Sequence, residues 1–341
     1  MRRTRLLVTA VAFLGAVVGG SAHAQDALEG RITGELVAGT DGAMLGDDLT
    51  LDFIVLEGAE VAGTLSTEVE EDGTFIVVVP LDAERRYVPR VVYQGVSYFG
   101  QPVAVTEEQP QVGALIPPLY ETTSEAPDLS IGETVVTIVA LDRNTGELGF
   151  IREDFVLNPS DMVYVGGEDN ITLRLPTAER TVDALGENAD GAFALQEGLL
   201  TTTVPIRAEG GTSIVTRYLV TYDVAEDEYV LRVTTPIPAD RLVVRVPEDY
   251  VRDIEILGEG VPGETEFFEV AEGDPVPLRT IVMENAGPGD SLVVRLDGLA
   301  LERNDNPLAE PPGSIIAGAI ALAVIGAAGA VAIRRSRGAE A

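Results

Sequence analysis

Short alternations of apolar and polar residues fill the middle of the chain, and they predict β-strands. The runs lie about ten residues apart and are separated by Gly, Asn, Asp and Pro, as is typical of strands joined by tight turns. Outside the two ends, no stretch has the period of an amphipathic helix of ordinary length. We therefore expect an all-β body, most simply tandem β-sandwich domains of transthyretin-like or Ig-like type. Seven runs carry the pattern: DLTLDFIVL (Asp48–Leu56), GTFIVVVPL (Gly73–Leu81), ETVVTIVAL (Glu133–Leu141), TRYLVTYDV (Thr216–Val224), EYVLRVTT (Glu228–Thr235), DRLVVRVP (Asp240–Pro247) and DSLVVRL (Asp290–Leu296).

Turn residues and prolines suggest how the strands are grouped. DRNTGE (Asp142–Glu147) and AEDE (Ala225–Glu228) each separate two runs and predict β-hairpins. The proline-rich stretch 107–129 predicts a linker between a first domain, 25–106, and a second β-sandwich region, 130–300. The pattern leaves open whether 130–300 forms one or two Ig-like domains, and a weaker break is expected at Glu259–Pro277.

The C-terminal end predicts a membrane anchor. Ser314–Ile333 is a run of 20 uncharged residues, and a helix of that length crosses about 30 Å of hydrocarbon. The arginines of the tail, 334–341, predict a cytoplasmic side, and 301–313 predicts a polar stalk. A buried core helix and a sorting tail cut after export are the alternatives. Small residues recur every four positions, from Ser314/Gly318 to Gly326/Ala330, which would allow a homodimer through the anchor.

The N-terminal end predicts a signal peptide over 1–24. A basic start is followed by the apolar segment Leu6–Val18 and by small residues at Ala22 and Ala24, before a cleavage site at Gln25. An uncleaved first transmembrane helix is the alternative. Together the two ends predict a single-pass type I membrane protein whose bulk lies outside the cytoplasm, in the periplasm or beyond the cell.

Composition excludes much of enzyme chemistry. The sequence contains no cysteine and no lysine, and its one histidine, His23, lies in the predicted signal peptide. Thiol nucleophiles, Schiff bases, histidine bases and histidine or thiolate metal sites are therefore excluded from the mature chain. A pair of carboxylates, as in a glycan hydrolase, is the least favoured alternative that remains. We expect no enzyme, no catalytic residues, no cofactor and no metal-ligand set.

The charge is strongly acidic, with a net charge of −33. Setting aside the three arginines of 1–24 and the net +2 of the tail leaves −38 on 25–333. Such a surface repels nucleic acid, so we expect no nucleic-acid partner. A calcium-stabilised adhesin is one alternative, but ENADGAF (Glu187–Phe193) lacks the final glutamate of an EF-hand loop. The glycosylation sequon Asn170–Thr172 carries weight only in a host with the machinery.

The first domain resembles carboxypeptidase-regulatory-like domains, which are small sandwiches of transthyretin-like topology. The resemblance lies in GRITGELV (Gly30–Val37), EDGTFIVVVPL (Glu71–Leu81) and YVPRVVYQGVSYFG (Tyr87–Gly100). It implies a tight turn at Asp72–Gly73 and a core position for Phe75. More loosely, 120–247 resembles the second module of bacterial envelope proteins of this architecture, through FVLNPSDMVYVGG (Phe155–Gly167). The resemblance implies accessory, adhesive or carbohydrate-contacting modules and carries no reaction and no functional residue.

Four aromatic residues are the one candidate ligand-binding face. Tyr87, Tyr93, Tyr98 and Phe99 could line a sugar or peptide site, although core packing is the better interpretation. Pro89, in the same run, predicts an edge strand because proline cannot donate to the ladder.

Function follows from these terminal signals, the strand-rich body and the missing side-chain chemistry. We expect a non-catalytic binding or scaffolding protein of the bacterial cell envelope, held by Ser314–Ile333, with a protein or carbohydrate ligand. An accessory subunit of an envelope maturation or transport complex is a further alternative.

Overall fold

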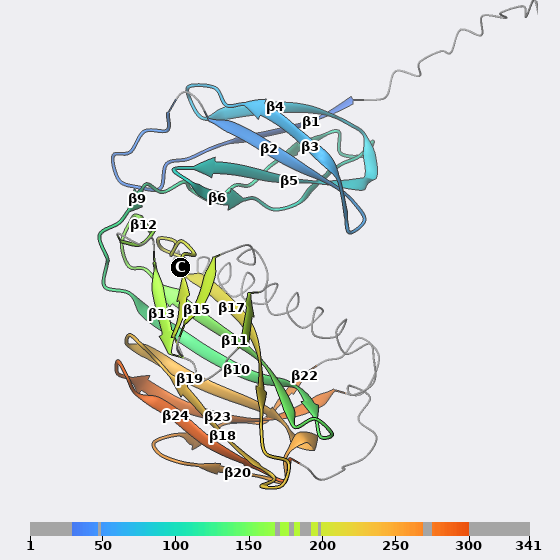
Figure 1. Ribbon diagram of the computed structural model, residues 1–341. Coiled ribbons are helices and arrows are strands. Elements are labelled where there is room, and N and C mark those ends of the chain that lie inside the picture. Colours follow the sequence, from blue (N-terminus) through green and yellow to red (C-terminus); the bar gives the residue numbers. More distant parts are fainter. Residues whose placement is uncertain are drawn as a thin grey trace, which may run out of the picture. The chain divides into compact units, whose positions relative to one another are not determined.

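The computed structural model describes residues 29–46, 49–167, 171–176, 181–184, 192–196, 199–268 and 275–299 (Figure 1). The predicted signal peptide 1–24, the stalk 301–313, the span Ser314–Ile333 and the tail 334–341 lie outside these residues, as do Asn170 and most of Glu187–Phe193. The described chain is all-β, built from several sheets, with one short 3₁₀ turn, η2 (Glu248–Tyr250). The expectation of an all-β class is confirmed.

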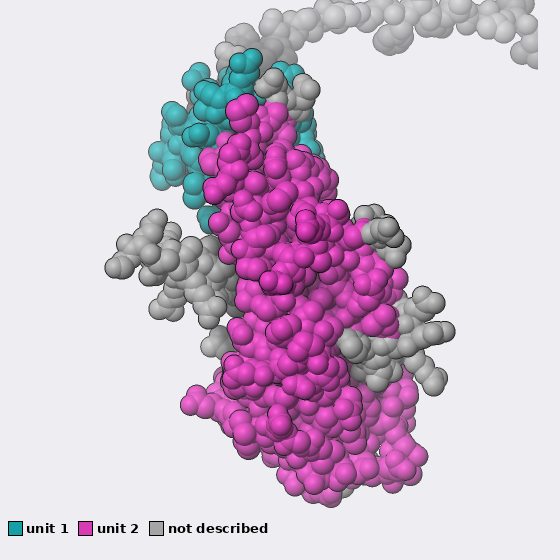
Figure 2. Space-filling view, turned by 90° about the vertical axis from the view of Figure 1, so that its left-hand side faces the viewer, with its two compact units in different colours: residues 1–35, 50–90, 99–116 teal, residues 36–49, 91–98, 117–341 magenta. Residues whose placement is uncertain are grey.

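The chain divides into two compact units (Figure 2). Unit 1 comprises 1–35, 50–90 and 99–116, and unit 2 comprises 36–49, 91–98 and 117–341. The division crosses the hairpin at 91–98, which counts with unit 2 although its flanking strand begins in unit 1. The predicted linker 107–129 is not free chain, since it contributes a strand to the first sheet described below.

A three-stranded sheet with the order β4-β1-β8 forms one layer of unit 1. Its strands are β4 (Thr74–Pro80), β1 (Glu29–Glu35) and β8 (Gln111–Gly113). β1 pairs antiparallel with β4 and parallel with β8. The side chains of β4 alternate strictly between exposed and buried, as expected for a strand with one face on a core.

A second sheet has the order β3-β2-β5-β6, with β7 also paired to β5. Its strands are β2 (Thr50–Glu57), β3 (Glu60–Glu68), β5 (Asp82–Tyr93), β6 (Val96–Phe99) and β7 (Val103–Val105). The rings of Phe53 on β2 and Phe75 on β4 are 6.0 Å apart, so the two sheets meet through their buried faces. The predicted core position of Phe75 is confirmed. The predicted turn at Asp72–Gly73 is also confirmed, with Gly73 at φ 85° and the amide of Thr74 donating to Asp72 Oδ1.

The prediction that Pro89 marks an edge strand is wrong. β5 lies inside its sheet, with β2 on one side and β6 and β7 on the other, and the Pro89 side chain is buried. The carbonyl of Pro89 accepts a hydrogen bond from the amide of Gly100, which follows β6. The nitrogen of Pro89 therefore faces the place where the partner of β5 changes from β6 to β7, and a missing donor is tolerated there.

Unit 2 is built on an eight-stranded sheet with the order β14-β17-β11-β10-β19-β23-β21, and β22 also pairs with β23. The parallel pairing of β10 with β19 joins the two halves of the region 130–300 into one sheet. β21 and β22, which lie in the predicted break Glu259–Pro277, both pair with β23 of this sheet. The strands are β10 (Ser130–Asp142), β11 (Glu147–Leu157), β14 (Thr181–Ala184), β17 (Thr212–Thr221), β19 (Ala239–Pro247), β21 (Val261–Pro262), β22 (Glu266–Phe268) and β23 (Val276–Ala286).

Two three-stranded sheets share a core with this large sheet, and their orders are β13-β16-β15 and β18-β24-β20. One cluster of buried residues includes Phe150 of β11, Leu200 of β16, Leu231 of β18 and Val244 of β19. The large sheet and both small sheets thus pack around common apolar contacts. The remaining strands are β9 (Thr122–Thr123), β12 (Val163–Tyr164), β13 (Leu173–Pro176), β15 (Phe193–Gln196), β16 (Leu199–Thr202), β18 (Glu228–Thr234), β20 (Asp253–Ile256) and β24 (Ser291–Asp297).

One of the two predicted hairpins is confirmed. Asp142 pairs with Glu147 at the end of the β10–β11 hairpin, and Asp142 Oδ1 accepts the amides of Asn144 and Thr145. These hydrogen bonds lower the pKa of the Asp142 carboxyl, the Asn144 amide most. The hairpin at Ala225–Glu228 is wrong, because β17 and β18 belong to different sheets and the turn carries the chain from one sheet to the other.

Candidate functional site

The predicted aromatic face is not a surface. Tyr87, Tyr93 and Tyr98 are buried, and only Phe99 is partly exposed. The guanidinium of Arg90 lies 5.9 Å from the ring centroid of Phe99, within cation–π range. Core packing, the favoured interpretation of these residues, is confirmed for the three tyrosines.

Tyr98 anchors a polar cluster within unit 2. Its hydroxyl accepts a hydrogen bond from the amide of Tyr120 at 3.1 Å and donates to the carbonyl of the same residue at 3.2 Å. Burial raises the pKa of the Tyr98 hydroxyl, and the backbone hydrogen bond with Tyr120 opposes that rise. One side chain therefore satisfies both backbone groups of a buried residue that has no sheet partner there.

Arg207 and Glu209 complete this cluster. The guanidinium of Arg207 lies 5.7 Å from the ring centroid of Tyr98 and donates to the carbonyl of Ser97 at 3.0 Å. The hydroxyl of Tyr120 donates to Glu209 at 2.9 Å. Burial, with the neighbouring carboxylate of Glu209, raises the pKa of Tyr120 to about 12. Each of the four side chains, Tyr98, Tyr120, Arg207 and Glu209, thus has a partner from the chain itself, as expected of a cluster that serves the structure.

Strand β11 carries three consecutive charged residues, Arg152, Glu153 and Asp154. Arg152 and Asp154 are both buried and joined by two hydrogen bonds, from Arg152 Nε at 2.8 Å and from Nη2 at 2.9 Å. Thr134 Oγ1, on β10, donates to the same carboxylate at 2.8 Å. Charged hydrogen bonds of this two-pronged kind are the strong ones in proteins. The hydrogen bond from Thr134 to Asp154 links β10 to β11. Because Arg152 and Asp154 are buried, neither side chain is accessible to a ligand.

Glu153 points to the opposite face of the same sheet. The pairing register places Val135 of β10 and Val215 of β17 beside it, and both are buried. Ser213 Oγ donates to Glu153 Oε1 at 2.8 Å. Burial raises the pKa of the Glu153 carboxyl, while the hydrogen bond from Ser213 and the charge of Arg245 oppose the rise.

Arginine–carboxylate pairs flank Glu153 on this face. Arg241 Nη1 lies 3.0 Å from Glu133 Oε1, and Arg241 Nε lies 3.4 Å from Glu284 Oε1. Arg245 is paired with Glu266 at 2.9 Å. These half-exposed pairs contribute little stability individually, but they leave the guanidinium groups engaged with the chain's own acids.

The raised pKa of the Glu153 carboxyl is the feature of this region that could serve acid–base catalysis. Among the described carboxyl groups, Glu153 alone has a raised pKa, the property of a general acid. Its Oε1 is occupied by Ser213 and its neighbours on both adjacent strands are valines. Desolvation beside apolar side chains therefore explains the shift without a reaction. Sequence reasoning missed this residue, although the run IRED (Ile151–Asp154) places three charges in the middle of a strand.

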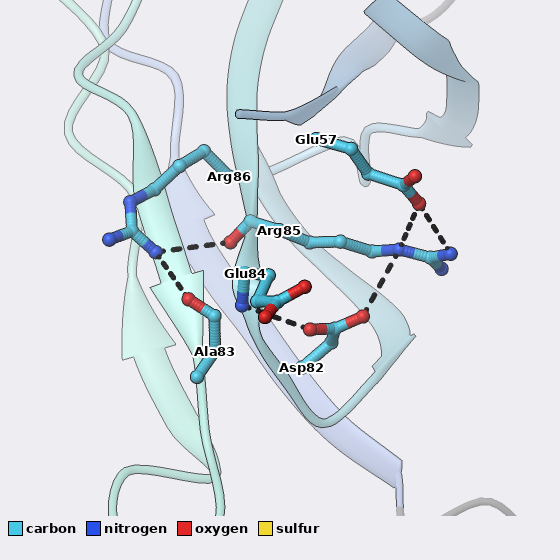
Figure 3. A network of polar contacts seen from close by, with 6 residues as sticks. All are labelled: Glu57, Asp82, Ala83, Glu84, Arg85 and Arg86. Atoms are coloured by element: carbon cyan, nitrogen blue, oxygen red, sulfur yellow. Dashed lines mark hydrogen bonds and ion pairs between the residues drawn. The ribbon is translucent and has the colours of Figure 1, made fainter. Parts of the chain in front are cut away.

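Unit 1 has a smaller polar network at the start of β5 (Figure 3). Arg85 contacts Glu57 of β2 at 2.7 Å and Asp82 at 3.3 Å, and the hydrogen bond with Glu57 is the main cause of the raised Arg85 pKa. Arg86 donates instead to the carbonyls of Ala83 and Arg85. Arg85 thus ties the beginning of β5 to β2, whereas Arg86 makes its hydrogen bonds within β5.

Two features are absent from the described ranges. No three acidic or histidine side chains there lie together in a way that could hold a metal ion. No helix within those ranges has the length and apolar character needed to cross a bilayer.

Comparison with known proteins gives structural matches of low similarity. No protein-family model and no curated protein matches it. One similar solved structure is a candidate protease from Parabacteroides distasonis, with a TM-score of 0.24 and 10% identity over 50% of this chain and 40% of that chain. Another is AChBP from Bulinus truncatus, with a TM-score of 0.18 and 10% identity over 51% of this chain and 91% of that chain. The match thus spans less than half of the candidate protease, and likenesses this low carry no argument about function.

Proposed function

We propose that this protein is a non-catalytic, membrane-anchored binding or scaffolding protein of the bacterial cell envelope. In this proposal the signal peptide 1–24 directs export, the helix Ser314–Ile333 holds the chain in the membrane, and the all-β body stands outside the cytoplasm. The ligand is a protein or a carbohydrate. No nucleic acid is bound, because the exported segment is strongly acidic.

The body in this proposal consists of β-sandwiches. Residues 25–106 form a carboxypeptidase-regulatory-like sandwich of transthyretin-like topology, supported by the contact of Phe53 with Phe75 between the two sheets of unit 1. Residues 130–300 form an Ig-like sandwich region, supported by the packing of the eight-stranded sheet with two smaller sheets around one core.

One observation carries the proposal. The exported segment has carboxylates, hydroxyls and arginines as its only reactive side chains. The charged groups on β11 and around it are paired with one another, except Glu153, which accepts a hydrogen bond from Ser213. Catalysis by these groups would require a carboxylate that is both activated and accessible. A surface made for contact with another molecule has no such requirement.

Co-purification from membranes tests the proposal. The full chain, with a C-terminal affinity tag, is expected to stay with the membrane fraction after an alkaline wash and to bring down one reproducible partner after detergent extraction. Because the chain has no lysine, photo-activated crosslinking should replace amine chemistry. A tagged single-pass protein of unrelated sequence serves as the control for non-specific capture.

Two results would contradict the proposal. One is a full chain that leaves the membrane fraction in the alkaline wash. The other is turnover of a glycan or peptide by the purified chain that is lost when a single carboxylate, Glu153 first, is changed to the amide.

A further inference from the structure

Strand β4 ends its sheet with an unusually bare edge. It is the terminal strand in the order β4-β1-β8, and its seven residues, TFIVVVP, carry no charge. Ile76 and Val78 are 60% and 51% exposed. The other uncharged edge strands in the described part of the chain are shorter, such as β6 with four residues. Exposed edge strands in natural proteins usually carry a charged residue or a proline that prevents pairing with another chain. β4 has no such residue before Pro80, at its end.

Hydrogen bonds of β1 show which backbone groups of β4 face outward. The amide of Arg31 donates to Pro110, and the carbonyl of Thr33 accepts from Ala114, so both residues face the β8 side. The intervening residues of β1 therefore face β4, where Ile32 is paired with Val77. Because strand residues alternate in direction, the amides and carbonyls of Ile76 and Val78 point away from β1.

Few of the outward-facing backbone groups of Ile76 and Val78 have a hydrogen-bond partner within the described chain. The carbonyl of Ile76 accepts one long hydrogen bond of 3.4 Å from Thr67 Oγ1 of β3. The structure gives the amides of Ile76 and Val78 no hydrogen-bond partner within its described ranges. Pro80, which has no N–H, closes the edge at its end. Two donors and the carbonyl of Val78 thus remain for an added strand.

Strand β3 leaves apolar surface uncovered on the same side. Leu65 pairs with Phe53, which is fully buried, yet Leu65 is 37% exposed. The bond from Thr67 to Ile76 places β3 beside the outward edge of β4. Because the sheet β4-β1-β8 ends at β4, no strand of that sheet covers Leu65 of β3. A strand added at β4 would bury Leu65 as well as complete the ladder.

The charge around this edge indicates the partner. Unit 1 has thirteen acidic residues against four arginines over 29–35, 50–90 and 99–116, a difference of nine negative charges. The turn before β4 contributes Glu70, Glu71 and Asp72, all exposed. β3 begins at Glu60 and ends at Glu68. A second copy of this chain would bring like charges together, whereas a basic segment would be attracted.

We propose that β4 accepts an extended segment of a different protein as an additional strand, with alternating apolar residues and with lysine or arginine at its ends. The inference rests on the proposed binding function and assigns it a surface. Backbone hydrogen bonds to Ile76 and Val78 supply the pairing, and Leu65 of β3 receives the apolar side chains.

Labelled peptides added to the full chain in detergent test this. The probe is the peptide Lys-Lys-Thr-Val-Thr-Val-Thr-Val-Lys-Lys, and the control peptide has Glu-Glu in place of Lys-Lys at both ends. Fluorescence anisotropy measures the binding of each peptide. We expect the lysine-ended peptide to bind at least tenfold more tightly and to weaken as salt is raised. Val78→Pro, which removes an outward amide without touching the β1 ladder, is expected to abolish binding. Val78→Thr keeps the amide and should bind as the unmodified chain does.

Three outcomes would overturn the proposal. They are no binding of the lysine-ended peptide, equal binding of both peptides, and binding by Val78→Pro that matches Val78→Thr while both variants keep the same circular dichroism. A second copy of this chain is the other possible occupant of the β4 edge. Sedimentation without peptide measures the oligomeric state, and a dimer that Val78→Pro abolishes would assign the edge to that second copy. None of these outcomes alters the co-purification result, so failure of this inference and failure of the proposed function are separable.

Discussion

Arg152 and Asp154 sit two residues apart on β11 and form a closed ion pair inside the core of unit 2. Their side chains are 7% and 0% exposed, and Arg152 Nε lies 2.8 Å from Asp154 Oδ2. Spacing by two places both side chains on one face of the strand. The pair is therefore made locally, while its burial depends on sheets that come from distant parts of the sequence.

Breaking this pair from one side should be costly. Asp154→Ala leaves the Arg152 guanidinium buried without its carboxylate, and Thr134 loses its acceptor. We expect a loss of about 3–5 kcal/mol in the free energy of unfolding. Because the chain has no tryptophan, urea unfolding followed by circular dichroism is the measurement.

Replacing both partners provides the control. In Arg152→Met with Asp154→Leu no charge is left buried, so the loss should be well below that of Asp154→Ala. A double variant that is as unstable as the sum of the two single variants would mean that the charges do not interact.

Glu153 should make stability depend on pH in the opposite sense to an ordinary paired acid. Burial raises its pKa in the folded state, so ionisation costs more in the folded chain than in the unfolded one. The destabilisation is present above the folded pKa and is relieved as the pH falls through it toward the unfolded value. Glu153→Gln should therefore raise Tm at about pH 8, and this increase in Tm should become smaller as the pH is lowered to about 4.

An exposed glutamate is the matched control for this prediction. Glu264 is exposed, so Glu264→Gln changes the net charge by the same amount without removing a buried carboxyl. If the two variants shift Tm equally at every pH, relief of the chain's general negative charge explains both, and burial of Glu153 has no effect of its own.

Strand positions followed from the sequence, but strand partners did not. All seven predicted runs overlap strands, because alternation is a local property of the residues. The parallel pairing of β10 with β19 joins segments about a hundred residues apart, and no local pattern specifies such a contact. The same limit explains both errors: neither Pro89 nor the turn Ala225–Glu228 reveals which strands lie on either side of it.

The polar clusters were less predictable than the strands. Arg152 and Asp154 could have been noticed, since opposite charges two apart within a strand share a face. Nothing in the sequence indicates that this face is the buried one. Tyr98, Tyr120 and Glu209 come together only through the folded path of unit 2. Composition was the more informative signal, because the absence of whole classes of side chain does not depend on the fold.

Removing the Tyr98 hydroxyl should destabilise the protein. Tyr98→Phe leaves the buried amide and carbonyl of Tyr120 without the hydroxyl that bonds both. We expect a loss of about 1–3 kcal/mol, measured by urea unfolding. Tyr87→Phe is the control, because the buried Tyr87 hydroxyl has no hydrogen-bond partner in the described part of the chain. Burial raises the pKa of Tyr87, and the nearby Arg85 opposes that rise. Equal losses in the two variants would show that the contacts with Tyr120 contribute nothing.

Gly30, on β1, should not tolerate a methyl group. A Cβ there would meet the side chains of Val105 and Leu81 and would lie 2.8 Å from the carbonyl oxygen of Pro110. Gly30→Ala should therefore force apart the contact between β1 and the segment leading into β8, at a cost of about 1–3 kcal/mol. Gly63, on β3, has open space around the same position, so Gly63→Ala should be neutral or slightly stabilising by restricting the unfolded chain. The two variants make the same chemical change in strands of one unit, and a loss of equal size in both would contradict close packing at Gly30 as the cause.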